Sequence, residues 1–252
     1  MHLIVTVTTV LAIVSPVIVL ATKPPTFTIE WHEITPQTYP DLRPTLEALE
    51  PVFSRSFAPV LTRYIRLYGP PEDMKRAGIE SSDEHTLLER ITAFVQGDWL
   101  QMVEENAHKP DSGYLAIAKN DRQETIGFAL FAKETFEEHM HGAVAIDGTV
   151  QDQHTFDELA SNSQDTAYIA ILSVDPAAQG IGVGRSLVFS ILDHCPEIKK
   201  IFLTTSADPL NQKTHAFYDR LGFTYVLRVM LNHSSWGNFW REKRVYLYQR
   251  IN

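Results

Sequence analysis

The order of apolar patterns along the chain predicts a mixed α/β domain in which helices cover a central sheet. A short strand pattern comes first, and two long segments with helical spacing follow it. A hairpin pattern comes next, and the C-terminal part then reads strand, helix, strand, helix, strand, strand. Alternation of this kind is typical of a layered domain built around one sheet.

The composition indicates a folded chain. It has 252 residues, of which 44% are hydrophobic and 21% are charged. This length fits one large domain or two small ones. The single cysteine, Cys195, excludes an internal disulfide framework and a cysteine-rich zinc module. The net charge of −9 argues against general nucleic-acid binding, which needs clustered Lys and Arg to neutralise phosphates.

The charge is unevenly distributed along the chain. Residues 1–133 carry a net −5, residues 134–184 carry −9 with no Lys or Arg, and residues 185–252 carry +5. An acidic middle beside a basic C-terminal part would suit two ligands of opposite charge. A solvated surface is the commoner cause of such a pattern, and both interpretations stay open.

The N-terminal residues 1–22 are largely apolar and contain no acidic residue, Lys or Arg. Pro16 and the small residues near Ala21 favour a signal peptide, but the missing positive charge at the start disfavours it. Residues 3–21 are barely long enough for a membrane anchor. A poorly ordered or packed apolar extension is the third interpretation. We predict a cytoplasmic protein, with a membrane-anchored or secretory one as the alternative.

Local patterns define the elements of the first half. Alternation over residues 27–35 predicts a strand, and apolar spacing predicts helices over 41–67 and 83–107. Two apolar runs, 113–119 and 125–132, flank a polar turn and predict a β-hairpin.

A long acidic segment separates this half from the next. Residues 134–165 are polar, and loops of this length in compact domains are usually functional or disordered. A nearly continuous apolar strand is expected over 168–174. The remaining predicted elements are a helix over 180–194, a strand over 200–205, a helix over 211–221, and strands over 223–230 and 244–250.

A glycine-rich segment follows the strand that ends at Val174. Three alternate glycines, Gly180, Gly182 and Gly184, open the next helix. Without Cβ atoms, several backbone N–H groups can converge on one anion, and the helix start adds a positive dipole end. The segment therefore predicts a phosphate or pyrophosphate site. It lacks the third glycine of a dinucleotide fingerprint and the Gly-Lys-Ser/Thr of a Walker A loop.

Two motifs together resemble the GNAT superfamily of acyl-CoA N-acyltransferases. The run from Gln179 to Gly184 matches Q/R-x-x-G-x-G/A, and the run from Asn211 to Phe223 is similar to N-x-x-A-x-x-x-Y-x-x-x-G-F, with Thr214 in place of Ala. The resemblance implies a mixed, mostly antiparallel central sheet flanked by helices. It also implies a single domain over residues 23–252, with the acidic segment 134–165 as an insertion.

The resemblance further implies an N-acetyltransferase that moves the acetyl group of acetyl-CoA to a primary amine by direct attack. Tyr218 would protonate the leaving thiolate, although a packing tyrosine is the alternative from helix spacing alone. Backbone groups of Leu172, Ser173 and Val174 would bind pantetheine, and the Val174 N–H would stabilise the oxyanion. The implied coenzyme A contacts are completed by Asn211 and by Gln179, Gly180, Ile181, Gly182, Val183, Gly184 and Arg185.

The acceptor is less constrained than the donor. The acidic segment favours a cationic amine, in a small molecule or a peptide. The amine must lose a proton before it attacks, and candidate bases are Glu134, Glu137, Glu138 and Asp165. A non-catalytic acyl-CoA sensor or interaction module is the alternative function.

Other chemistry-bearing residues have more ordinary interpretations. His139, His141 and His154 show no ligand spacing of a known metal site, so we expect no metal. Cys195 is expected to be structural. A hairpin tip near the acceptor, or ordinary packing of the last strands, would explain the cluster of Trp236, Phe239, Trp240, Arg241, Lys243 and Arg244. The oligomeric state is left open.

Overall fold

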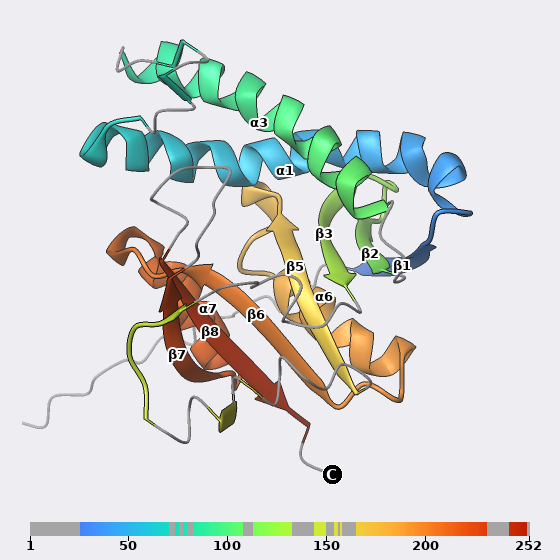
Figure 1. The fold of residues 1–252 in the computed structure, drawn as a ribbon. Coiled ribbons are helices and arrows are strands. Elements are labelled where there is room, and N and C mark those ends of the chain that lie inside the picture. Colours follow the sequence, from blue (N-terminus) through green and yellow to red (C-terminus); the bar gives the residue numbers. More distant parts are fainter. Residues whose placement is uncertain are drawn as a thin grey trace, which may run out of the picture.

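The computed structural model in Figure 1 describes most of the chain from residue 26 onward. The described residues are 26–70, 74–75, 78–79, 83–107, 113–132, 144–149, 154–155, 157, 165–230 and 242–250, without the side chains of 98 and 100–107. The apolar segment 1–22, most of the acidic insertion and the expected hairpin tip lie outside them.

The elements agree with the sequence patterns apart from their ends and one short strand. In chain order they are β1 (Phe27–Ile34), α1 (Tyr39–Tyr68), α3 (Glu84–Ala107), β2 (Gly113–Asn120), β3 (Thr125–Ala132), β4 (Val144–Ala145), β5 (Thr166–Val174), the 3-10 turn η1 (Pro176–Ala178), α6 (Val183–His194), β6 (Lys200–Ser206), the 3-10 turn η2 (Pro209–Asn211), α7 (Gln212–Arg220), β7 (Thr224–Met230) and β8 (Glu242–Gln249). The unpredicted strand, β4, lies inside the acidic insertion.

The strands form one sheet in the order β1-β2-β3-β5-β6-β8-β7-β4. The pair β5–β6 is parallel and the other described pairs are antiparallel. The predicted fold class, a mixed and mostly antiparallel sheet flanked by helices, is therefore confirmed. In Figure 1, α1 and α3 run side by side over one face, and α6 and α7 lie behind the sheet.

Each face of the sheet has its own apolar core. Under α1 and α3, the Trp99 ring is fully buried and lies 4.8 Å from the Phe53 ring centroid and 5.1 Å from that of Phe128. Its indole N–H donates to the Leu46 carbonyl at 2.9 Å, so α3 is joined to α1 through a satisfied polar group. On the other face, α6 buries Leu187, Val188 and Ile191 among the residues of the second core.

Candidate active site

The parallel strands β5 and β6 separate along their length. Their pairing runs from Thr166 opposite Lys200 to Ile169 opposite Leu203 and then stops. Beyond that point β5 stays paired with β3 as far as Val174, and β6 stays paired with β8 as far as Ser206. The facing edges of β5 and β6 are therefore not joined to each other by a ladder at their carboxyl ends.

A β-bulge lies at the same place on β5. Leu130 and Phe131 of β3 are consecutive, but they face Ile171 and Ile169, so Ala170 is the extra residue. A bulge bends the strand and strengthens its twist, and bulges are common beside active sites. Here the bulge comes directly after the last β5–β6 pair, where β5 turns away from β6.

The alternation of the strand decides which backbone groups face the gap. The N–H of Asp175 donates to the Ile126 carbonyl on the β3 side at 2.9 Å. Because N–H and C=O groups alternate along a strand, Ser173 also faces β3, whereas Leu172 and Val174 face the gap. Two of the three predicted pantetheine-binding residues therefore present backbone groups to the gap. The Val174 carbonyl accepts a hydrogen bond from Gln179 Nε2 at 3.3 Å.

The Ser173 side chain points into the α1 side of the sheet. It is 1% exposed, and its Oγ lies 2.7 Å from Ser56 Oγ and 3.2 Å from the Val52 carbonyl oxygen. Ser173 thus fastens the end of β5 to α1.

The glycine-rich loop has the backbone conformations that its glycines allow. Gly180 has φ 82° and Gly182 has φ 96°, both in the left-handed region that L side chains rarely adopt. Gly182 is the N-cap of α6, and the first helical hydrogen bond joins Ser186 N–H to its carbonyl at 3.0 Å. The predicted helix over 180–194 therefore starts three residues later, because neither glycine has a helical φ. The N–H groups of the first turn have no intrahelical acceptor, as an anion site requires.

The side chains of this loop differ in how far they are buried. Val183 is buried, Ile181 is 42% exposed, and Arg185 is exposed with its guanidinium carbon 5.3 Å from the Phe189 ring centroid. A Cβ on Gly184 would lie 3.2 Å from the Phe217 ring, so this glycine lets α6 approach α7 closely.

Tyr218 lies on α7 and is 6% exposed. Its ring packs against those of Phe217, Phe223 and Tyr246 at centroid distances of 5.1, 5.4 and 6.0 Å. Burial raises the pKa of Tyr218 well above its ordinary value, and the nearby Tyr168 phenol of β5 adds to the rise. The side chain is therefore protonated through the neutral range.

Asn211 lies just before α7 rather than on it. It ends η2, which Asp208 caps by accepting from the Leu210 N–H at 2.7 Å, and it is the N-cap of α7, so the helix predicted over 211–221 begins one residue later. Its Nδ2 donates to Thr205 Oγ1, and to the Ser206 carbonyl at 3.2 Å. The side-chain amide is thereby held at the carboxyl end of β6.

His215 supports the same strand end and was not predicted as a site residue. Its Nε2 lies 2.9 Å from the Ser206 carbonyl, an acceptor only, so this nitrogen carries the proton. Burial lowers the pKa of His215, which keeps the ring neutral. A lone histidine in a helix pattern has no sequence signal that would mark this role.

The expected acceptor residues fall into two groups. Glu134, Glu137, Glu138, His139 and His141 lie outside the described residues, as do Trp236, Phe239, Trp240 and Arg241. Asp165 is described, and it precedes β5 at the end remote from the gap. A strand of nine residues at about 3.3 Å per residue puts it roughly 30 Å from Val174, far from the carboxyl end of the gap.

Lys243 belongs to the cluster that the sequence analysis assigned either to a hairpin tip near the acceptor or to packing of the last strands. It lies in β8 opposite Ser206, the last residue of β6. Burial lowers the pKa of Lys243 to about 7. A large share of its amine is therefore uncharged near neutral pH, beside the strand that borders the gap.

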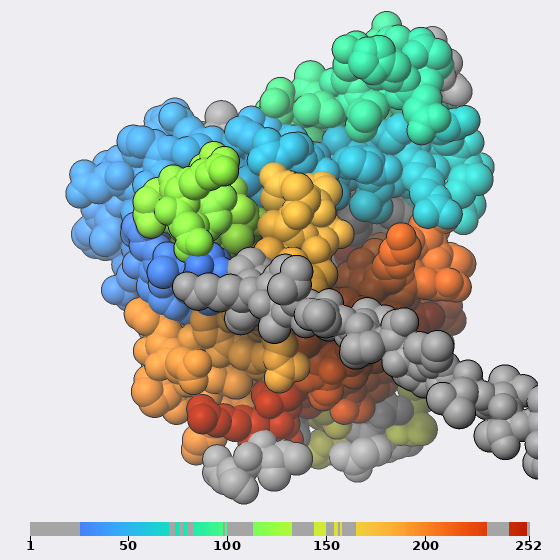
Figure 2. All heavy atoms as spheres, turned by 180° about the vertical axis from the view of Figure 1, so that it is seen from behind, coloured from blue at the N-terminus to red at the C-terminus, as the bar shows by residue number. Residues whose placement is uncertain are grey.

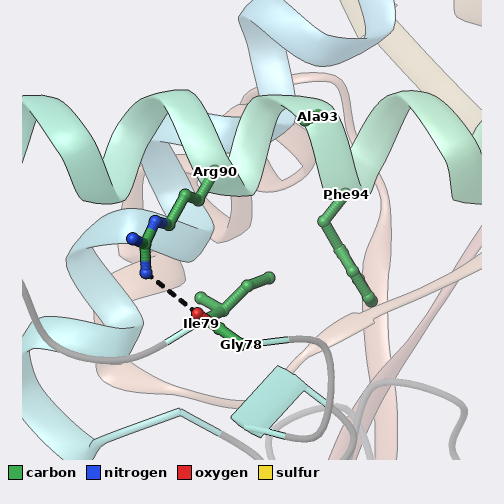
Figure 3. A pocket seen from close by; sticks show the side chains of 5 residues that line it. All are labelled: Gly78, Ile79, Arg90, Ala93 and Phe94. Carbon is green, nitrogen blue, oxygen red and sulfur yellow. Dashed lines mark hydrogen bonds between the residues drawn. The ribbon is translucent and has the colours of Figure 1, made fainter.

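A pocket of about 420 Å³ lies elsewhere, between α3 and the turn at Gly78 and Ile79 (Figure 3). Arg90 Nη1 donates to the Gly78 carbonyl there at 2.9 Å. Its lining residues are Gly78, Ile79, Arg90, Ala93 and Phe94, and none of them belongs to β5, β6, α6 or α7. Among the described residues, no group of three or more His, Cys, Asp or Glu could hold a metal ion.

A parallel strand pair that separates beside a glycine-rich helix start defines a site for a phosphate-bearing ligand that lies along a strand edge. The acetyltransferase (GNAT) family model matches residues 80–223, over half of the chain. The chain belongs to the GNAT acetyltransferase family, whose enzymes use acetyl-CoA as the acyl donor.

Solved structures of acetyltransferases resemble this chain at low identity. An acetyltransferase from Thermus thermophilus is 15% identical, with 88% of this chain and 97% of that one covered and a TM-score of 0.46. The ribosomal-protein-S18-alanine N-acetyltransferase from Escherichia coli is 14% identical, with 90% and 96% covered and a TM-score of 0.46. The PaiA N-acetyltransferase from Thermoplasma acidophilum, in complex with coenzyme A, is 14% identical, with 88% and 99% covered and a TM-score of 0.43.

No curated protein sequence matches the chain. The family assignment therefore rests on the family model. Within the described ranges, no helix combines the length and the apolar character needed to cross a membrane. Residues 1–22 lie outside those ranges, and the three interpretations of that segment stay predictions.

Proposed function

We propose that this acetyltransferase moves the acetyl group of acetyl-CoA to a primary amine of a small molecule or peptide, by direct attack in a ternary complex. The observation that carries the proposal is the gap between β5 and β6. The backbone groups of Leu172 and Val174 face it, and the glycine-rich helix start follows at the same end.

The donor would bind along this edge. The N–H groups of Gly180 to Gly184 and the start of α6 suit the pyrophosphate, because they are converging donors at a positive helix end. The backbone groups of Leu172 and Val174 that face the gap would hydrogen-bond the pantetheine amides. The pantetheine would then lie along β5 as a neighbouring strand does. The Nδ2 of Asn211 donates to the Ser206 carbonyl of β6, and its side-chain oxygen would accept a hydrogen bond from the cofactor. Arg185 is exposed near the helix start, and a phosphate oxygen would compete with its contact to Phe189.

The chemistry needs an oxyanion donor and an acid. As the amine attacks the thioester carbonyl, the new C–N bond forms and negative charge develops on oxygen, which the Val174 N–H would stabilise. The carbonyl then re-forms as the C–S bond breaks, and the thiolate takes a proton from the Tyr218 hydroxyl. The attacking nitrogen loses one proton to solvent, and solvent returns one proton to Tyr218, so that the products are the amide and the free thiol. Burial holds that proton on Tyr218 before each turnover.

The acceptor proposal rests on charge. Residues 134–184 carry −9, which favours a cationic amine. Of its described residues, Val144 to Thr149 begin with β4 on the outer side of β7 and are separated from β6 by β8 and β7. Asp165 and Asp175 flank β5, and Asp175 is paired with Arg55. Support for a cationic acceptor thus comes from the net charge and not from a described contact at the gap.

Tyr218→Phe tests the proposed acid. We expect kcat to fall about 100-fold or more, as for the loss of a general acid, while the KM for acetyl-CoA changes little. Thiol release would be followed with a panel of primary amines, for the wild type and the variant. Tyr248→Phe is the matched control, because it removes a hydroxyl from a half-buried tyrosine on the same face.

Three outcomes separate the hypotheses. Unchanged turnover in Tyr218→Phe would show that another group protonates the thiolate. Tight acetyl-CoA binding without turnover of any amine would favour the alternative, a non-catalytic acyl-CoA sensor or interaction module. A wild type that does not bind acetyl-CoA would contradict the whole proposal.

A further inference from the structure

Two neighbouring residues of α1 fasten that helix to the end of β5. Arg55 Nη2 lies 2.7 Å from Asp175 Oδ2, and its Nε donates to the same oxygen at 2.9 Å. Ser56 Oγ lies 2.7 Å from Ser173 Oγ. In the view from behind, α1 (blue to cyan) and the segment that follows β5 (yellow to orange) lie against each other (Figure 2).

Asp175 is the residue where β5 becomes the glycine-rich loop. Its backbone N–H still bonds β3, at Ile126. Its Oδ1 accepts from the Ala177 N–H at 2.9 Å and so caps η1, the first turn of the loop. Oδ1 therefore orients the loop, and Oδ2 is held by Arg55. The carboxylate joins α1, β3 and the loop at one point.

The location of this pair separates it from the reacting atoms. Arg55 comes from the helix layer on one face of the sheet, whereas α6 lies on the other face. We infer that Arg55 is a positioning residue, which acts through Asp175 to hold the glycine-rich loop in the conformation that binds the acyl-CoA pyrophosphate. This inference rests on the proposed function.

The energetics predict an effect on binding rather than on folding. The Arg55 side chain is 53% exposed and that of Asp175 is 18% exposed, and a pair of this kind contributes little to the free energy of unfolding. Anion binding, in contrast, needs several loop N–H groups to point at one ligand at the same time. A glycine-rich loop that also adopts other conformations would bind acetyl-CoA more weakly, because only part of the molecules would have the binding conformation at any time.

A double-mutant cycle in the full-length chain tests the inference. The variants are Arg55→Gln, Asp175→Asn and the double variant, and Asn at position 175 can still cap η1. We expect each single change to raise the Kd for acetyl-CoA about two- to fivefold, as for loss of a partly exposed charged pair, and the double change to be no worse than either. The kcat at saturating acetyl-CoA should stay within about twofold, and Arg55→Lys should recover part of the affinity.

Arg43→Gln is the matched control, since Arg43 forms an exposed pair with Glu47 on the same helix. The inference is overturned if Arg55→Gln binds acetyl-CoA as tightly as this control. It is also overturned if Arg55→Gln weakens binding but Asp175→Asn does not, or if the two effects add, because Arg55 would then contact the cofactor directly. A wild type that fails to bind acetyl-CoA overturns the proposed function and this inference together, whereas a wild type that binds normally isolates the inference.

Discussion

At the scale of the residue, the candidate site depends on backbone conformations that side chains would prevent. Gly180 and Gly182 both have φ in the left-handed region, and nothing lies within 4 Å of a Cβ built on either. Space is therefore not the constraint at these positions. Glycine is required there because of the backbone angle.

Gly182→Ala tests this requirement. We expect the free energy of unfolding to fall by about 1 kcal/mol, the cost of a left-handed conformation for an L residue, and acetyl-CoA to bind more weakly. Urea denaturation and calorimetric titration measure the two effects.

The control is Gly97→Ala. Gly97 lies in α3, with no positive φ, and a methyl group at this position would have no other atom within 4 Å. Alanine there should therefore stabilise the helix by about 0.5–1 kcal/mol. Equal effects at the two glycines would contradict the argument from φ.

At the scale of the element, side-chain contacts stabilise a helix and a strand whose local sequences do not favour them. Helix α1 contains Pro44, Pro51 and Pro59, each of which removes a backbone N–H, and all three are exposed. The opposite side of α1 is buried in the core under α3, so packing compensates for the lost hydrogen bonds.

Strand β4 has only two residues and is attached through a neighbouring side chain. Asp147 beside it accepts hydrogen bonds from the Tyr225 hydroxyl and the Arg228 N–H of β7, each at 2.8 Å.

The attachment of β4 should be sensitive to acid. Partial burial alone would raise the pKa of Asp147, but the hydrogen bonds from Tyr225 and Arg228 and the Arg228 charge outweigh it, and the pKa is lowered. A lowered carboxyl pKa contributes stability above the unfolded value of about 3.9, and this stability is lost as the pH falls through the folded value. We expect the protection factors of the amides at residues 144–149, taken relative to the unfolded-chain exchange rate at each pH, to fall below about pH 4.

Asp147→Asn should show faster exchange at residues 144–149 already at pH 6, with a weaker further response to acid. Asp193→Asn, on the exposed side of α6, is the control. If the protection factors of these amides in the wild type are the same at pH 3 and pH 6, Asp147 does not hold β4.

At the scale of the whole molecule, one sheet separates two large apolar cores, and a third, smaller cluster contains Tyr168, Phe202 and Leu227. The core under α1 and α3 contains Trp99, and the core under α6 contains Leu187 and Ile191. Strands β3 and β5 contribute to both cores, because their side chains alternate between the faces. The layers should therefore unfold together, as the prediction of a single domain over residues 23–252 requires.

Trp99→Phe tests this coupling. We expect a loss of about 2–4 kcal/mol of unfolding free energy, from the cavity and from the lost hydrogen bond to the Leu46 carbonyl. Calorimetry should still show one transition, with equal calorimetric and van't Hoff enthalpies.

Trp31→Phe is the control in the opposite layer, where the ring is only half-buried and stacks on His194 at 4.3 Å. It should cost less than the change at Trp99. Two separate transitions, of which Trp99→Phe shifts only one, would show two independently folding units.

Local sequence patterns were enough to predict the elements and the place of the glycine-rich loop after β5. The periodicity of apolar residues and the φ demands of glycine act within a few residues, so they can be read without the fold. The run from Gln179 to Gly184 was recognised on this basis, and so were the helix that contains Tyr218 and the strand that ends at Val174.

How these pieces meet depends on contacts that exist only in the folded chain. The last β5–β6 pair at Ile169, the bulge at Ala170 and the place of β4 depend on strand register, which no local pattern specifies. The Arg55–Asp175 pair joins residues 120 positions apart, and partial burial in the folded chain lowers the pKa of Lys243. Such contacts form when distant segments become neighbours, because burial and pairing depend on the whole fold, and one chain segment alone does not encode them.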